Sequence, residues 1–254
     1  MSGGGRGDRS VAEKLFAIAD AFAGGEELTL TDIARRARLP LSTTHRLVGQ
    51  WAEWGGLVRA DDGRYRVGMR LWRLGVRQPT AMRLRNAAMP YLEDLLDATG
   101  EHVHLAVRDG LGVVYLERRS GEHAVAMVSD VGTVLPLHAT GVGLALLAHA
   151  PGEVYDDVVA AGLTRFLPNT ITEEPELRRR LAEVRGTGIA TSVQALTRGA
   201  FSVAAPVRDA TGEVVAAVSI IAHVERLGEP QFALGVRIAA RGISAALGYR
   251  PPGT

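Results

Sequence analysis

The side chains with the most evident chemistry lie between Pro40 and Trp54, in a run that reads PLSTTHRLVGQWAEW. Its apolar members recur at helical spacing and predict the inward side of a helix: Leu47, Val48, Trp51 and Trp54. The other side would expose hydroxyl, imidazole, guanidinium and amide groups: Thr43, Thr44, His45, Arg46 and Gln50. Such groups form hydrogen bonds with base edges and phosphates. Because no nucleophile stands beside a base here, the set favours nucleic-acid recognition over catalysis.

Further helices would position this one. Apolar residues at helical spacing predict a short amphipathic helix in front of a break at residues 38–40. Pro40 ends that helix, and we expect Ser42 or Thr43 to cap the next one by accepting a hydrogen bond from a free amide of its first turn. Two helices joined in this way form a helix-turn-helix. We expect Ser10 to cap a further helix, which runs to about residue 22 and covers both.

A hairpin is predicted directly after the second helix. Two short strands, 57–59 and 64–67, frame Asp62-Gly63, which is a strong hairpin signal. A hairpin in this position is the wing of a winged helix-turn-helix. The predicted DNA contacts are Ser42, Thr43, Thr44, His45, Arg46, Gln50, Arg59 and Arg64. Arg46 is the first candidate for a guanine or phosphate contact. The alternative is a helical and hairpin subdomain whose polar face is merely solvated.

Charge is distributed unevenly along the chain. Residues 1–86 hold 15 Lys and Arg against 9 Asp and Glu, a net charge of +6, while the remainder carries −5. A basic first third on an acidic body fits a DNA-binding module joined to a second domain. The absence of cysteine excludes disulfides and thiolate metal sites. Because the sequence has neither a signal peptide nor about 20 successive apolar residues, we expect a cytoplasmic protein without a membrane partner.

The chain after the wing predicts an α+β domain with an antiparallel sheet. A long helix over 80–98 leads into strands that alternate from His102, including one over 125–128. Helices follow, strands return between residues 189 and 222, and a long helix closes the chain. The expected organisation is a flexible tail (1–9), the winged domain (10–75), a linker helix (76–86) and a second domain (87–250).

Enzyme and metal signatures are missing from the sequence. There is no G-x-S-x-G elbow, no H-E-x-x-H and no recognisable pair of carboxylates, so we expect no catalytic residues. His102 and His104 share a strand face but have no third ligand at suitable spacing, so we expect no metal. Gly141-Val142-Gly143 lacks the third glycine of a dinucleotide site, and no cofactor is expected. His138 is interpreted as a packed, hydrogen-bonded imidazole, with ligand contact as the alternative.

Four segments together resemble the IclR family of bacterial transcription regulators. They are LTLTDIARRARLPLSTTHRL, DGRYRVG, LHATGVGLALLA and GIATSVQALTRGAFSVAAPVRDATGEVVAAVSI, in that order along nearly the whole chain. The resemblance implies a winged helix-turn-helix, a connecting helix and a GAF-like effector-binding domain. It also implies homodimers, which in this family often pair into homotetramers, and a small acidic metabolite that alters DNA binding.

The same resemblance implies a ligand pocket between the glycine-containing turn and the sheet. By motif position it would involve Gly141, Val142, Ser192, Ser202, Ser219 and Ile221, with Met127, Leu135 and Ile221 as an apolar wall. Two departures concern the effector: Leu144 stands where members usually have Lys, and residues 192–195 lack the acidic side chains that members often carry. A carboxylate or aromatic metabolite is expected, and a less polar ligand is the alternative. For each serine, a purely structural hydrogen bond is the competing interpretation.

The predicted function is therefore a DNA-binding transcriptional regulator, more specifically a repressor of a catabolic or metabolic operon that responds to a small-molecule effector. A dimer would place two recognition helices about 34–36 Å apart on an inverted repeat of double-stranded DNA. Two alternatives remain: a ligand sensor that acts through protein contacts, and an enzyme that uses the winged domain for docking.

Overall fold

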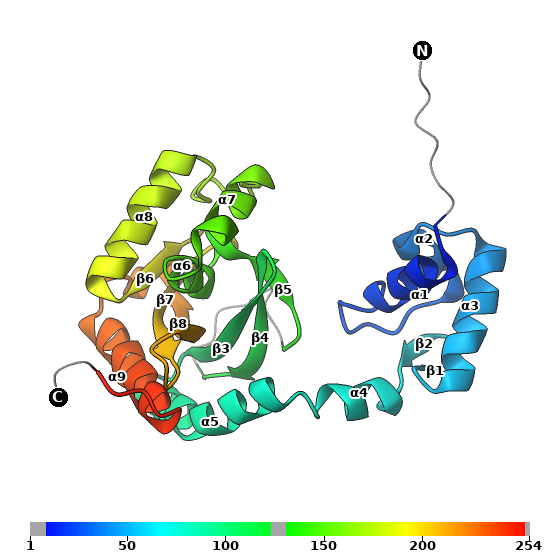
Figure 1. Ribbon diagram of the computed structural model, residues 1–254, viewed down its shortest axis with the longest axis horizontal. Coiled ribbons are helices and arrows are strands. Elements are labelled where there is room, and N and C mark those ends of the chain that lie inside the picture. The colour runs from blue at the N-terminus through cyan, green and yellow to red at the C-terminus, as the bar shows by residue number, and fades with distance from the viewer. Residues whose placement is uncertain (1–8, 123–130, 252–254) are drawn as a thin grey trace, which may run out of the picture. The chain divides into compact units, whose positions relative to one another are not determined.

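The computed structural model describes residues 9–122 and 131–251 of the chain. They belong to two compact units, Met1–Pro79 and Thr80–Thr254 (Figure 1). In the described part of the chain, no helix is both long and apolar enough to span a membrane.

The first unit is a winged helix-turn-helix. Its elements are α1 (Val11–Asp20), α2 (Leu30–Ala37), α3 (Leu41–Trp54), β1 (Leu57–Arg59), β2 (Tyr65–Val67) and α4 (Met69–Gly75). Ser10 caps α1 as predicted, in a capping box with Glu13. Helices α1, α2 and α3 and strand β1 enclose an apolar core whose fully buried members include Ile18, Ile33 and Leu47.

The wing is confirmed by its strand pairing. Strands β1 and β2 run antiparallel, with Leu57 opposite Val67. The backbone groups of Leu28 and Tyr65 also exchange two hydrogen bonds, of 2.9 and 2.7 Å, which tie the wing to the segment before α2.

The predicted N-cap of helix α3 is wrong. Helix α3 begins at Leu41, directly after Pro40, and no side chain caps it. Ser42 and Thr43 therefore lie inside the first turn, where their backbone is already helical, and cannot act as the N-cap. The turn before α3 instead depends on Arg38, which ends α2 in the left-handed conformation with φ 54° and ψ 49°.

The second unit is built on a six-stranded antiparallel sheet, in the strand order β5-β4-β3-β8-β7-β6. Its strands are β3 (His102–Asp109), β4 (Gly112–Arg119), β5 (Val134–Pro136), β6 (Ala190–Val193), β7 (Ala200–Arg208) and β8 (Val214–His223). All the pairings are antiparallel, as predicted. The strand predicted at 125–128 lies outside the described residues.

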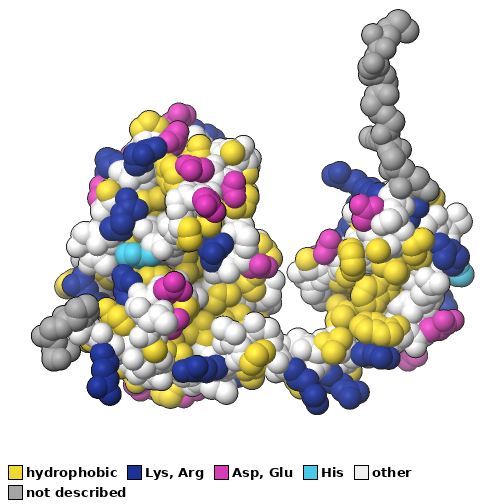
Figure 2. Space-filling model, viewed as in Figure 1, with side chains coloured by type: hydrophobic (Ala, Val, Ile, Leu, Met, Phe, Trp, Pro, Cys, Tyr) yellow, Lys and Arg dark blue, Asp and Glu magenta, His cyan; other side chains and the backbone are white. Residues whose placement is uncertain are grey.

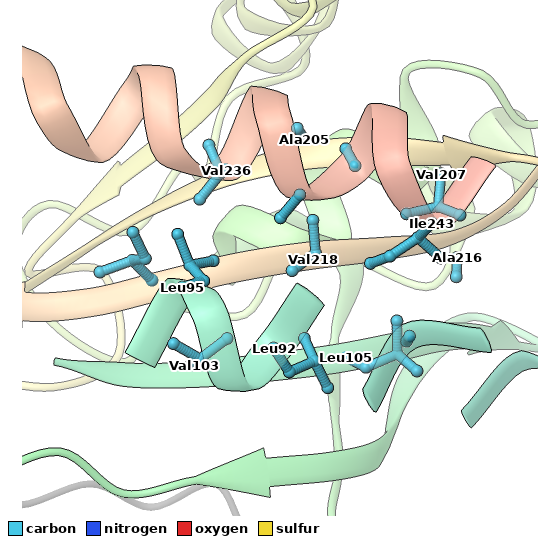
Figure 3. Packing of buried hydrophobic residues seen from close by; sticks show 14 of the residues in the cluster. Leu92, Leu95, Val103, Leu105, Ala205, Val207, Ala216, Val218, Val236 and Ile243 are labelled. Carbon is cyan, nitrogen blue, oxygen red and sulfur yellow. The ribbon is translucent and has the colours of Figure 1, made fainter. Parts of the chain in front are cut away.

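Helices cover both faces of this sheet (Figure 1). They are α5 (Pro79–Thr99), α6 (Gly141–Leu147), α7 (Gly152–Ala160), α8 (Glu174–Thr187) and α9 (Pro230–Ala246), with short 3₁₀ turns at Leu137–Ala139 and Val224–Arg226. Helices α5 and α9 pack on one face, where Leu92 and Leu95 meet Val218 and Val236 (Figure 3). Helices α6, α7 and α8 share a second core over the other face.

We expect Phe232→Ala to destabilise the second unit by about 3–5 kcal/mol, because the ring is 1% exposed and its loss leaves a cavity beneath α9. Leu234→Ala on the same helix removes a side chain that is 59% exposed, and should cost less than about 0.5 kcal/mol. Urea unfolding followed by circular dichroism measures both changes in stability. Tryptophan fluorescence would report on the first unit instead, because that unit holds all three tryptophans. Equal losses in the two variants would contradict this packing.

Candidate nucleic-acid interface and ligand cavity

The predicted polar face of α3 is largely exposed. Ser42, His45, Arg46 and Gln50 are exposed and Thr43 is half-buried, whereas Leu47 and Val48 are buried. The helix therefore presents hydroxyl, imidazole, guanidinium and amide groups on one side. These groups are the donors and acceptors that contact base edges and phosphates.

Thr44 does not belong to this face, and its predicted exposure is wrong. Its side chain is fully buried, and its hydroxyl donates a hydrogen bond to the carbonyl of Pro40 at 3.0 Å. The reason is helical periodicity: Thr44 lies three and four residues before Leu47 and Val48, so all three share the inward side. A direct base contact by Thr44 is excluded in this conformation.

Trp54 was predicted to point inward but is 38% exposed. It lies in the last turn of α3, where its ring meets Trp51 edge-on with centroids 5.4 Å apart. The guanidinium of Arg70 lies 4.7 Å from the centre of the Trp54 ring. Trp54 thus joins α3 to α4 at the surface instead of entering the core.

The segment from α2 into α3 is rich in basic residues, and the acidic residue of α3 is Glu53 in its last turn. Residues 33–52 contain no Asp or Glu but hold four arginines and His45. Arg46 has no hydrogen bond or ion pair to any described residue. In the wing, the Arg59 guanidinium lies 5.9 Å from the centre of the Tyr65 ring, and Arg64 lies 3.4 Å from Asp62. Arg46 is thus the guanidinium of α3 that stays available to an external anion.

The second unit contains a cavity between α6 and the sheet. Seven of the eight residues predicted for the effector pocket line it together: Leu135, Gly141, Val142, Ser192, Ser202, Ser219 and Ile221. The eighth, Met127, lies outside the described residues. The volume of the cavity is about 50 Å³, below the range typical of small-molecule sites.

Strand register explains why these serines meet. Ser202 of β7 lies opposite Ser192 of β6 on one side and Ile221 of β8 on the other. Directly paired residues of antiparallel strands project to the same face of a sheet, so the three line one wall. Glycine at position 141 leaves room for Ser202, because a Cβ here would lie 2.4 Å from the Ser202 hydroxyl oxygen and 3.3 Å from its Cβ.

Sequence reasoning missed more than half of the cavity wall. The additional lining residues are Tyr115, Ala139, Thr140, Gln194, Ala195, Leu196, Thr197, Ala200 and Phe201. Residues 194–197 form a loop that Thr170 holds by donating a hydrogen bond to the Ala195 carbonyl at 2.6 Å. This contact joins residues 25 positions apart, and no local pattern announces it. Two signals were present in the sequence: strand alternation places Tyr115 on the same side as Val113, and residues 192–195 are one of the two places where the chain departs from the family.

The described lining of the cavity carries no charged side chain. Its polar groups are serine and threonine hydroxyls, the Tyr115 phenol and the Gln194 amide. Burial raises the pKa of Tyr115, so the phenol stays protonated and can donate a hydrogen bond. Ser192 is partly used within the fold, because its hydroxyl donates to the Ala139 carbonyl at 3.4 Å. Such a wall suits a small molecule with hydroxyl, carbonyl or carboxylate groups and an apolar body.

A buried imidazole pair stands beside this cavity. His102 and His104 of β3 are 2% and 0% exposed, and their rings stack with centroids 6.3 Å apart. His104 lies opposite Ser219 in register and meets the Tyr115 ring edge-on at 5.0 Å. Burial, with smaller contributions from the charges of His102 and Arg118, lowers the pKa of His104 to about 3. At neutral pH this imidazole is therefore uncharged.

The histidines do not form a metal centre with other described residues, among which no group of three or more His, Cys, Asp or Glu could hold an ion. His138 is a packed, hydrogen-bonded imidazole, as predicted: it is 4% exposed, and its Nε2 lies 3.0 Å from the Thr164 carbonyl oxygen.

Comparison with known proteins gives matches over nearly the whole chain. Residues 11–61 match the family model described as the IclR helix-turn-helix domain, and residues 78–245 match that of the bacterial transcriptional regulator IclR C-terminal domain. The HTH-type transcriptional repressor AllR of Klebsiella pneumoniae is 35% identical over 233 residues, covering 89% of this chain and 85% of that protein. The glycerol operon regulatory protein of Streptomyces coelicolor is 34% identical over 244 residues, covering 93% and 95%.

Among solved structures, the fold is similar to that of an IclR homolog from Microbacterium hydrocarbonoxydans complexed with 4-hydroxybenzoate. The TM-score is 0.86 and the identity 38%, over 94% of this chain and 99% of that one.

The buried His104 predicts a loss of stability in acid. An unfolded imidazole binds a proton below about pH 6.5, whereas the folded one stays neutral down to a pKa of about 3. The free energy of unfolding is thus unaffected by the titration of His104 above pH 6.5, and below that it falls by about 1.4 kcal/mol per pH unit as the pH drops towards 3. His104→Phe should flatten this slope in urea unfolding experiments at pH 7, 6 and 5. His223→Phe, at an exposed position, should not. An unchanged slope in His104→Phe would mean that the folded protein protonates this ring.

Proposed function

Because this chain belongs to the IclR family of bacterial transcriptional regulators, we propose that it is a ligand-responsive repressor of a catabolic or metabolic operon. Family membership makes the chain a DNA-binding regulator and not an enzyme. One observation carries the more specific proposal: a single chain joins a helix with an exposed face of hydroxyl, imidazole, guanidinium and amide groups to a domain whose cavity is lined by hydroxyls and apolar side chains. Residues 10–75 are assigned to DNA binding, residues 76–86, which include the start of α5, to the link between the domains, and residues 87–250 to effector binding, in a cytoplasmic protein.

The DNA contacts come from α3 and the wing. The proposed contact residues are Ser42, Thr43, His45, Arg46, Gln50, Arg59 and Arg64, of which all but Thr43 are exposed. Thr44 is left out because it is buried. Arg46 reads a guanine or holds a phosphate.

The assembly that fits this proposal is a homodimer on an inverted repeat, with a homotetramer as the alternative. Two recognition helices then enter successive major grooves about 34–36 Å apart. Exposed apolar side chains support self-association: Phe16, Met69 and Trp72 of the first unit are 65%, 64% and 58% exposed. Figure 2 shows apolar side chains gathered on the viewed face of that unit.

The proposed effector is an aromatic or small aliphatic acid. Its body packs against Leu135, Val142 and Ile221, and its polar groups bond to the hydroxyls of the cavity. The relative solved with 4-hydroxybenzoate supports an aromatic hydroxy acid as the first compound to test. No described lysine or arginine lines the cavity, so neutral donors would have to receive a carboxylate.

A sensor that acts only through protein contacts is the competing function. Salt separates the two, because DNA binding through phosphate contacts releases counterions and weakens steeply as the salt concentration rises.

We expect Arg46→Ala to reduce specific DNA binding at least tenfold, since a good bidentate base contact contributes about 1–3 kcal/mol and the dimer loses two of them. Gel-shift titration with the intergenic DNA beside its own gene measures this, and gel filtration should give the elution volume of the unsubstituted protein. Thr44→Val is the control: its buried position predicts unchanged affinity. Full affinity in Arg46→Ala would remove this residue from the interface.

Binding of 4-hydroxybenzoate should raise the melting temperature of the protein by several degrees, since a ligand at 100 times its Kd adds about 2.7 kcal/mol. Gly141→Val should abolish the rise, because its Cβ would collide with Ser202 and the rest of the side chain would fill the cavity. Gly152→Ala at the start of α7 is the control, since a Cβ there meets nothing within 4 Å. If small carboxylates, aromatic acids and related amides all fail to shift the melting temperature, the cavity is not the effector site.

A further inference from the structure

The turn between α2 and α3 holds an arginine in a conformation that favours glycine. Arg38 has φ 54° and ψ 49°. Its amide donates to the Arg35 carbonyl at 3.2 Å, and the next amide, of Leu39, donates to the Ala34 carbonyl at 3.0 Å. A helix end closed in this way requires a left-handed residue, and glycine adopts that conformation without a steric cost from Cβ. A side chain at this position is therefore retained against a backbone cost.

One other described non-glycine residue has a positive φ, and its side chain accounts for it. Gln194 has φ 48°, and its Oε1 accepts a hydrogen bond from the Gly199 amide at 2.9 Å, which closes its own loop. Arg38 has no equivalent role. Its guanidinium is exposed and makes no hydrogen bond, ion pair or ring contact with any part of the chain that the structure describes.

Neighbouring arginines are already used inside the unit. Arg35 pairs with Asp32 at 2.7 Å, and Arg36 pairs with Glu26. The Arg9 guanidinium donates to the last carbonyl of α2 at 3.0 Å. The guanidinium at the turn is thus an uncommitted charge, within the run of residues 33–52 that contains no acidic side chain.

The position of this charge indicates its partner. Only Leu39 and Pro40 separate Arg38 from the first residue of α3. The first turn of a recognition helix approaches base edges in the major groove, so the residues just before it lie at the edge of the groove, close to the sugar-phosphate backbone. Guanidinium groups bind phosphate with short, charge-assisted hydrogen bonds. We propose that Arg38 binds a phosphate of the DNA backbone beside the groove that α3 enters, an inference that rests on the proposed DNA recognition by α3.

Because a phosphate contact does not depend on base sequence, a random 30-base-pair duplex tests it. Fluorescence anisotropy with the full chain between 50 and 200 mM salt gives the slope of log affinity against log salt. Arg38→Gln keeps the Cβ and removes the charge, so the slope should fall by about 0.9 for each protomer bound. Arg38→Lys should retain the slope. Arg241→Gln removes the same charge from an exposed position on α9 and should leave the slope unchanged.

Arg38→Gly separates the contact from damage to the fold. Glycine relieves the backbone cost at the turn, so the melting temperature should stay equal to or above that of the unsubstituted protein while the salt slope falls as in Arg38→Gln. An unchanged slope in Arg38→Gln, or an equal fall in Arg241→Gln, would overturn the assignment while leaving DNA recognition by α3 intact. If the unsubstituted protein does not bind the duplex at any of these salt concentrations, the proposed DNA recognition fails, and this inference fails with it.

Discussion

Alternation of side chains across the antiparallel sheet is the constraint on which the second unit depends. On β7 and β8, Val203 and Val218 belong to the core under α5 and α9, while Ser202 and Ser219 face the cavity under α6. A shift of one residue in either strand would exchange these sets, burying the hydroxyls in the apolar core and opening the cavity to the large aliphatic side chains. The core that stabilises the domain and the wall that can bind a ligand are therefore set by one register.

The same principle, with a period of 3.6 residues, organises α3. The inward side is occupied by Thr44, Leu47 and Val48, and the outward side is left to His45 and Arg46. Burial of the inward side chains fixes the rotation of the helix about its axis, and this rotation decides where the outward side chains point. Thr44 is the informative member: its buried hydroxyl is satisfied by donating a hydrogen bond to the Pro40 carbonyl, so a polar residue can lie on the buried side.

Backbone conformations that disfavour side chains occur at both candidate sites. Arg38 precedes the recognition helix and Gln194 lines the cavity, and these are the described non-glycine residues with positive φ. Residues are kept in such conformations when the surrounding structure or the function requires them. His104 belongs to the same category of costly features, since neither of its ring nitrogens has a hydrogen-bond partner among the described atoms. Burying a polar group without a partner costs roughly 1–3 kcal/mol.

The sequence by itself determined the winged helix-turn-helix, the antiparallel α+β class and the family, because periodicity, the Asp-Gly turns and the order of motifs act within short segments. It also indicated seven of the residues that meet at the cavity, although only by resemblance. The burial of Thr44 follows from helical spacing to Leu47 and Val48, whereas the tertiary structure alone decided that Trp54 is exposed and that the loop at 194–197 lines the cavity. It also decided that His104 lies opposite Ser219, a residue 115 positions away. These features depend on how a helix rotates against its neighbours and on which strands pair, and such long-range contacts leave no local pattern from which they could be predicted.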